Sequence, residues 1–121
     1  MANRITSLCV DCTDAQLLAA FWIQVLGWHA VERADDDGMS IGSDDYPLRI
    51  DFLIVPDGPK RAKNRLHIDV NATDRDQDAE LERLLALGAK EVDVGQGDVP
   101  WYVLADPEGN EFCLLRARVD P

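Results

Sequence analysis

The chain repeats one set of structural signals at a nearly constant spacing. Thr13-Asp14 is a helix-start signal, and Thr73-Asp74 repeats it 60 positions later. Further pairs keep this spacing, namely Asp11 and Asn71, Pro47 and Pro107, and Phe52 and Phe112 at 60, and Gly27 and Gly88 at 61. A constant offset at so many caps and turns indicates two copies of one supersecondary unit. We place the copies at residues 1–58 and 65–121.

Each copy predicts the element order β-α-β-β-β. The helices are predicted from their N-caps, with Thr13 or Asp14 in the first copy and Thr73-Asp74 in the second, and from a glycine after each helix. The strands are predicted from apolar residues that alternate with polar ones. The predicted strands are 5–11, 28–32, 39–42, 48–55, 65–71, 90–94, 99–105 and 111–118, and the helices run to about 26 and over about 75–87.

This order predicts an α+β fold, with residues 1–121 as a single domain and the loop 56–64 as its one candidate linker. A helix covers one face of each sheet, so the other face needs cover of its own. Pairing two curved sheets encloses a cleft, which is the usual place for a ligand. Phe52 and Phe112 are expected under the helices. Their neighbours Leu53 and Cys113 then point into the cleft.

The segment 65–71 holds one of the two histidines of the chain. Alternation predicts that Leu66, Ile68 and Val70 face the helix, whereas His67 and Asp69 face the cleft. Three roles for His67 stay open at this point. It is a general base oriented by Asp69, a neutral hydrogen-bond donor to a ligand, or a side chain satisfied by water or backbone.

Other residues are expected to line the same cleft. By the repeat, Ser7 takes the place of His67 in the first copy. Trp101 is either a flat apolar wall for a planar ligand or a core or interface residue. Asp51 and Glu111 are equivalent acidic residues that either bind a cationic ligand or lie at a wet rim.

Composition narrows the classes of partner. Among 121 residues, 12 Lys and Arg stand against 23 Asp and Glu, for a net charge of -11. This balance argues against nucleic acid, whose phosphates need a basic face, and against anionic membranes, although acidity also serves solubility. No apolar run approaches the roughly 20 residues that span a bilayer. The N-terminus lacks a signal-peptide core, and three cysteines are a poor disulfide framework. We therefore expect a cytoplasmic protein.

Three motifs resemble a known family. They are the helix end Val25-Leu26-Gly27-Trp28, the strand Leu66-His67-Ile68-Asp69-Val70 and the turn Asp106-Pro107-Glu108-Gly109-Asn110-Glu111-Phe112. Together with the paired β-α-β-β-β units, they resemble the vicinal oxygen chelate superfamily. That superfamily includes glyoxalase, extradiol dioxygenases and bleomycin-resistance proteins. The resemblance is strongest to short glyoxalase-like proteins, and it implies a homodimer.

The resemblance also implies where a metal would bind. Metalloenzymes of the superfamily hold a divalent ion with His, Gln or Glu side chains from four strands, and these places correspond to Ser7, Leu53, His67 and Cys113. His67 alone matches, and Leu53 has no ligand atom, whereas a catalytic metal needs about three protein ligands. We therefore predict no cofactor and no family-type metal site.

The predicted function is binding of a small organic ligand in the cleft. The residues predicted to line it are Ser7, Asp51, Leu53, His67, Asp69, Trp101, Glu111 and Cys113. Two alternatives stay open. One is a metal-dependent lyase, isomerase or dioxygenase, with His67 and Asp69 as the candidate catalytic pair. The other is sequestration of a cationic antibiotic, as the resemblance to bleomycin-resistance proteins implies.

Overall fold

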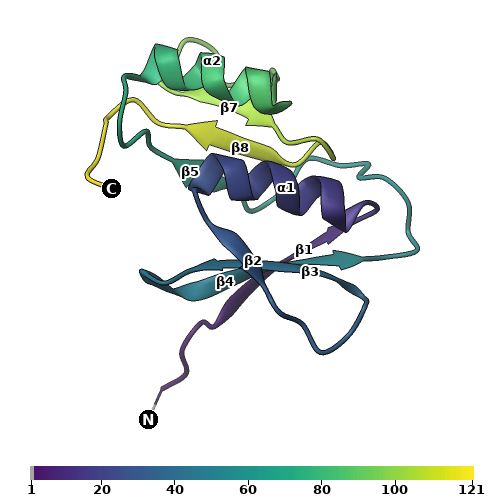
Figure 1. Cartoon of the computed structure of the whole chain (residues 1–121). Coiled ribbons are helices and arrows are strands. Elements are labelled where there is room, and N and C mark those ends of the chain that lie inside the picture. Colours follow the sequence, from purple (N-terminus) through teal and green to yellow (C-terminus); the bar gives the residue numbers. More distant parts are fainter. Residues whose placement is uncertain (1) are drawn as a thin grey trace. The chain divides into compact units, whose positions relative to one another are not determined.

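The computed structural model describes residues 2–121, which form two compact units that divide between Lys60 and Arg61. We call them unit 1 and unit 2. Each unit contains a four-stranded sheet and one α-helix in the order β-α-β-β-β, as the repeat predicts (Figure 1). The division lies inside the loop that was predicted as a linker. Among the described residues, every helix is too short or too polar to cross a membrane.

Unit 1 has a mixed sheet with α1 on one face (Figure 1). The sheet order is β1-β4-β3-β2, with β1 parallel to β4 and the other neighbours antiparallel. The core lies between helix and sheet, where Leu18, Ile41 and Phe52 are completely buried. The elements are β1 (Ser7–Cys12), α1 (Ala15–Leu26), β2 (His29–Val31), β3 (Gly38–Ser43) and β4 (Tyr46–Ile54).

Unit 2 repeats this arrangement with the sheet order β5-β8-β7-β6. Figure 1 shows α2 along β7 and β8. Leu84 from the helix and Leu104, Phe112 and Leu114 from the sheet are almost wholly buried. The predicted burial of Phe52 and Phe112 is thus confirmed. The elements are β5 (Ile68–Val70), α2 (Gln77–Leu87), β6 (Lys90–Glu91), β7 (Tyr102–Ala105) and β8 (Glu111–Leu114).

The two helix starts differ. α1 is capped by Asp14, whose carboxylate accepts the Leu17 N–H at 3.1 Å, in agreement with the sequence. For α2 the predicted cap Thr73-Asp74 is wrong. Asp76 is the N-cap and accepts the Ala79 N–H at 2.8 Å. Asp74 is instead bound by the neighbouring guanidinium of Arg75, so the helix begins after the expected residue.

The strands of unit 2 are shorter than predicted. β5 pairs with β8 only from Ile68 to Val70, so His67 lies just before the strand. Leu66 is 82% exposed, and its predicted place under the helix is wrong. The preceding loop is tied to β8, because the Asn64 N–H donates to the Glu111 carboxylate at 2.9 Å. This bond holds the chain that leads into β5 without adding residues to the sheet ladder.

The turn 106–110 between β7 and β8 has a structural role. The buried carboxylate of Asp106 accepts the N–H groups of Glu108 and Asn110, each at 3.0 Å. Gly109 has φ 86°, in the left-handed region that glycine tolerates best. This turn carried much of the family resemblance. It closes the hairpin of β7 and β8.

Candidate functional site

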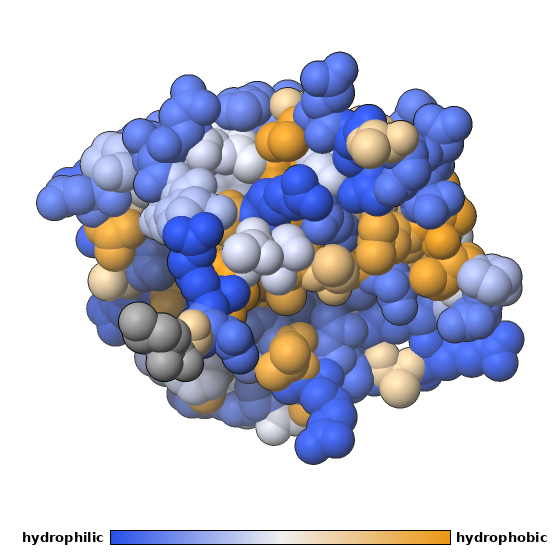
Figure 2. Space-filling model, turned by 90° about the horizontal axis from the view of Figure 1, so that it is seen from below, coloured by the Kyte–Doolittle hydropathy of each residue, from blue (hydrophilic) through white to orange (hydrophobic). Residues whose placement is uncertain are grey.

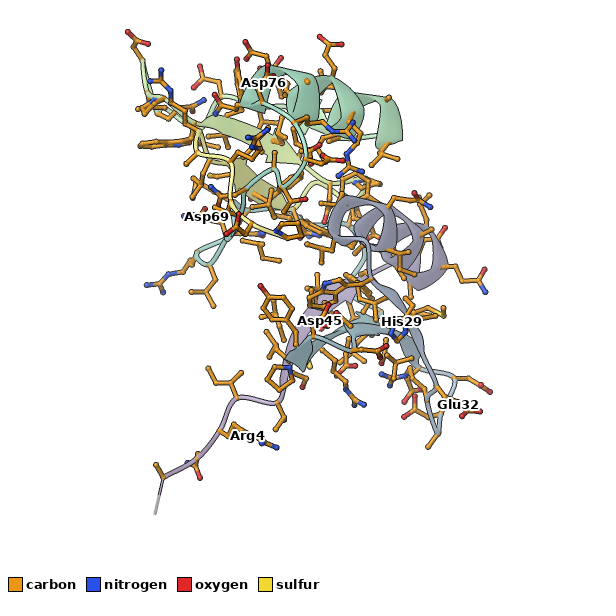
Figure 3. All side chains as sticks on the ribbon, turned by 60° about the vertical axis from the view of Figure 1, so that its left-hand side comes forward. Arg4, His29, Glu32, Asp45, Asp69 and Asp76 are labelled. Carbon is orange, nitrogen blue, oxygen red and sulfur yellow. The ribbon has the colours of Figure 1, made fainter. Side chains whose placement is uncertain are left out.

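The side of the unit 2 sheet away from α2, which we call its open face, carries the candidate site. Phe112 and Leu114 are buried in the core, so Cys113 between them points to the open face. Asp69 is the register partner of Cys113 on the neighbouring parallel strand and shares this face. Figure 3 shows Asp69 on the side of the sheet away from α2.

Three side chains meet there, and we call them the His67 cluster: His67, Asp69 and Cys113. Nδ1 of His67 lies 3.0 Å from Oδ1 of Asp69. Sγ of Cys113 lies 3.9 Å from the same Nδ1. All three ligand atoms are within 4.8 Å of one another. The prediction that His67 and Asp69 share a face holds in the structure, and Cys113 joins them.

The electrostatics of the cluster favour a protonated Cys113. Burial raises the pKa of its thiol above the ordinary value, and the carboxylate of Asp69 raises it further, while Lys63 opposes the shift. A reactive cysteine needs a lowered pKa to become a thiolate. Without a metal ion, Cys113 is therefore a hydrogen-bond donor and a poor nucleophile.

The His67 cluster borders a hollow of about 320 Å³, which we call the unit 2 hollow. Five predicted site residues line it: His67, Asp69, Trp101, Glu111 and Cys113. Sequence reasoning missed the other five, which are Lys63, Val94, Gln96, Val103 and Leu115. Two sequence features could have indicated Lys63 and Gln96 as lining residues. They are the basic loop that holds Lys63 and the Gly-Gln-Gly turn that holds Gln96.

Trp101 is 38% exposed and stands between two hollows of unit 2. The second measures about 510 Å³ and is bordered by the acidic start of α2. The side-chain amide of Gln77 donates to the carbonyls of Pro100 (2.9 Å) and Leu114 (3.2 Å), which holds the segment before Trp101 against the sheet. The Tyr102 hydroxyl donates to Asp78 at 2.7 Å, and this bond raises the pKa of Tyr102.

The remaining predicted residues belong to unit 1. Ser7 and Leu53 are half-buried on β1 and β4. Asp51 is buried and accepts a hydrogen bond from the Ser40 hydroxyl. Arg49 and Arg33 lie 3.2 and 3.5 Å from the same carboxylate. These contacts satisfy Asp51 inside its own unit, so we leave it out of the candidate site. Sequence reasoning missed both arginines.

Unit 1 also has a hollow of about 640 Å³. It is bordered by the start of α1 and by polar residues such as Arg33, Asp35 and Asp36. None of the residues predicted from the sequence to bind a ligand lies in it. We therefore do not take it as the candidate site.

Residues 7–115 match the family described as the glyoxalase-like domain. No curated protein matches the sequence. The fold is similar to several solved structures. A glyoxalase/bleomycin resistance protein/dioxygenase family enzyme from Burkholderia phytofirmans has a TM-score of 0.68 and 18% identity over 90% of this chain and 94% of the other.

Two further structures carry more specific descriptions. The fosfomycin resistance protein FosX from Listeria monocytogenes has a TM-score of 0.71 and 17% identity over 98% of this chain and 94% of the other. TnmS3, an antibiotic binding protein from a Streptomyces species, has a TM-score of 0.63 and 17% identity, covering 96% and 98%. At these identities the likeness shows a common fold.

Proposed function

Because the chain belongs to the glyoxalase-like domain family, we propose that it binds a small organic ligand on the open face of unit 2. The observation that carries the proposal is the convergence of an imidazole, a carboxylate and an exposed indole on the unit 2 hollow. Its volume of about 320 Å³ suits a small molecule, since ligand pockets measure about 300–1,000 Å³. Polar groups that converge in an apolar hollow are what such sites need.

The lining indicates the class of ligand. Trp101 supplies a flat wall, and Val94, Val103 and Leu115 add apolar surface. Asp69 and Glu111 outnumber Lys63, the one lysine of the lining, and favour a positively charged group, as does the net charge of -11. Sequestration of a planar cationic antibiotic is the sharper form of the proposal. The description of TnmS3 as antibiotic binding supports this form by analogy.

The competing function is metal-dependent catalysis. A mutant of the Listeria FosX is described as complexed with Mn(II) and 1S,2S-dihydroxypropylphosphonic acid. Mn(II) prefers oxygen ligands in octahedral geometry. The four family-type positions hold Ser7, Leu53, His67 and Cys113, of which Leu53 has no donor and Cys113 has a soft one. This set does not fit such an ion, so we derive no step through it.

The proposal includes a homodimer in the cytoplasm. Exposed large apolar side chains support self-association, with Leu17 and Ile54 each more than half exposed. On the surface drawn in Figure 2, hydrophobic residues form separate patches in a mostly hydrophilic surround. Among the described residues no disulfide joins two cysteines, as in proteins of reducing compartments. Light scattering after size exclusion tests the dimer, and a mass equal to one chain would contradict it.

A thermal-shift and fluorescence screen tests ligand binding, with planar cationic, neutral and anionic antibiotics on metal-free protein. We expect a cationic member to raise the melting temperature and to quench the indole fluorescence. Trp101→Leu should weaken binding by about tenfold, or 1.4 kcal/mol. Tyr46→Leu, which removes an exposed aromatic ring from unit 1, is the matched control. Equal loss in both variants, or no binding by any class, would refute the proposal.

A further inference from the structure

The His67 cluster holds three types of metal ligand in nearly the right geometry. A four-coordinate zinc ion has bonds of about 2.0–2.3 Å, which separate its N, O and S donors by about 3.3–3.6 Å. In the structure the N–O separation is 3.0 Å, the S–N separation is 3.9 Å, and all three donors lie within 4.8 Å of one another. Rotation of the exposed His67 and Asp69 side chains would adjust these separations around one ion.

The fold presents these donors together. Asp69 and Cys113 are register partners on parallel strands, so the sheet ladder fixes their backbone separation. His67 is two residues before Asp69, and its loop is anchored by the Asn64–Glu111 hydrogen bond. The side chains of His67 and Asp69 are 44% and 45% exposed, which leaves them accessible to an incoming ion.

The donor set selects a class of ion. A thiolate, an imidazole and one carboxylate suit borderline or soft ions such as Zn²⁺, Co²⁺ and Cd²⁺ better than Mg²⁺ or Mn²⁺. Asp69 is not among the four family-type positions, and all three donors belong to unit 2. The proposed site therefore differs from the family-type site both in its residues and in the ion that it favours.

We propose that His67, Asp69 and Cys113 bind one Zn²⁺-class ion within unit 2, with a fourth coordination position open toward the unit 2 hollow. Binding replaces the proton of the Cys113 thiol by a metal–sulfur bond and releases that proton to solvent. The Asp69 carboxylate and the neutral His67 nitrogen each donate an electron pair. The bound ion would carry a ligand or water beside Trp101.

Absorption spectroscopy of the chelator-treated chain with Co²⁺ tests the proposal. One equivalent should produce the thiolate-to-cobalt charge-transfer band and the strong visible bands of a four-coordinate site, and Zn²⁺ should remove them. Cys113→Ser should abolish the charge-transfer band. Asp69→Asn and His67→Gln should each weaken Co²⁺ binding by more than about 100-fold, beyond the 10–100-fold effect of residues that only support a ligand.

Matched controls come from β1 and β2 of unit 1. Cys9→Ser and His29→Gln remove a cysteine and a histidine outside the His67 cluster and should leave the spectrum unchanged. Circular dichroism confirms that each variant is folded. Absence of the band, its loss in Cys9→Ser, or its persistence in both Asp69→Asn and His67→Gln would overturn the assignment. The metal-free protein is used for the antibiotic screen, so failure here is distinct from failure of the proposed function.

Discussion

The two units differ in what surrounds the acidic residue of their last strand. In each unit an acidic residue precedes the buried phenylalanine of the last strand, Asp51 in unit 1 and Glu111 in unit 2. Asp51 is 5% exposed and is bound by Ser40, Arg33 and Arg49. Its charge is neutralised by side chains of the same unit. In unit 1 the acid is thus held in an internal ionic network.

In unit 2 the positions that correspond to these two arginines hold other residues. At the offset of 60, Arg33 and Arg49 correspond to Asp93 and Gly109. Glu111 accepts a backbone N–H, and the His67 cluster lies beside it around a hollow. The two copies of the unit thus keep an acidic residue at the same position but differ in the residues around it. One copy holds its acid in ion pairs, whereas the other places potential ligand atoms beside a hollow.

Substitution of the two acids, Asp51 and Glu111, should change stability the most and by different amounts. Asp51→Ala should lower the free energy of unfolding by about 3 kcal/mol, because it removes the buried carboxylate that Ser40, Arg33 and Arg49 share. Glu111→Ala should lower it less, by about 1 kcal/mol, because Glu111 is only half-buried and substitutions outside the core typically cost about that much. Urea denaturation measures both. Equal losses would remove the contrast between the faces.

The helices offer a smaller test of the same contrast. Gln77 of α2 donates to two carbonyls, so Gln77→Ala should lower the free energy of unfolding by about 1–2 kcal/mol. It should also weaken the effect of antibiotics on Trp101 fluorescence. Gln16 is exposed at the start of α1, and Gln16→Ala is the matched control with little effect. If Gln77→Ala changes neither the free energy of unfolding nor the Trp101 fluorescence response, these bonds do not hold the Trp101 segment.

The sequence predicted the elements better than the site. Period-two alternation placed Phe52 and Phe112 in the cores and put Cys113 on the open face. The pairing of Cys113 was not predictable. In unit 1, Cys9 lies opposite Asp51, so a strict repeat puts Asp69 opposite Glu111. The structure pairs Asp69 with Cys113 instead, a register difference of two residues.

Two other features could not be predicted from the sequence, for related reasons. Arg33 reaches Asp51 from a loop after β2, and no local pattern encodes that long-range contact. The cap of α2 moved because Asp74 and Asp76 are both good N-cap residues, and Arg75 binds the first. Local signals decide which elements form. Pairing between distant strands and competition for side chains decide what a site contains.

The smallest expected effect concerns pH. The hydrogen bond from Arg33 lowers the pKa of Asp35, and the Asp37 N–H lowers it further. A lowered pKa means that Asp35 stabilises the fold at neutral pH and that this contribution is lost as the pH falls through its folded-state pKa. Asp35→Asn should therefore be slightly less stable than the wild type at neutral pH, and the difference should vanish in acid. Asp36→Asn serves as control in the same urea titrations, and an Asp35→Asn difference that persists in acid would contradict this account.

The candidate metal ligands of unit 2 border a hollow, whereas the equivalent acid of unit 1 is bound by side chains of its own unit. The chain carries one histidine in each unit, His29 and His67, so a nitrogen-detected NMR spectrum of the histidine rings tests it directly. With one equivalent of Zn²⁺, we predict that the ring signals of His67 shift and those of His29 stay in place. A shift of His29 instead, or an unchanged His67, would contradict the account.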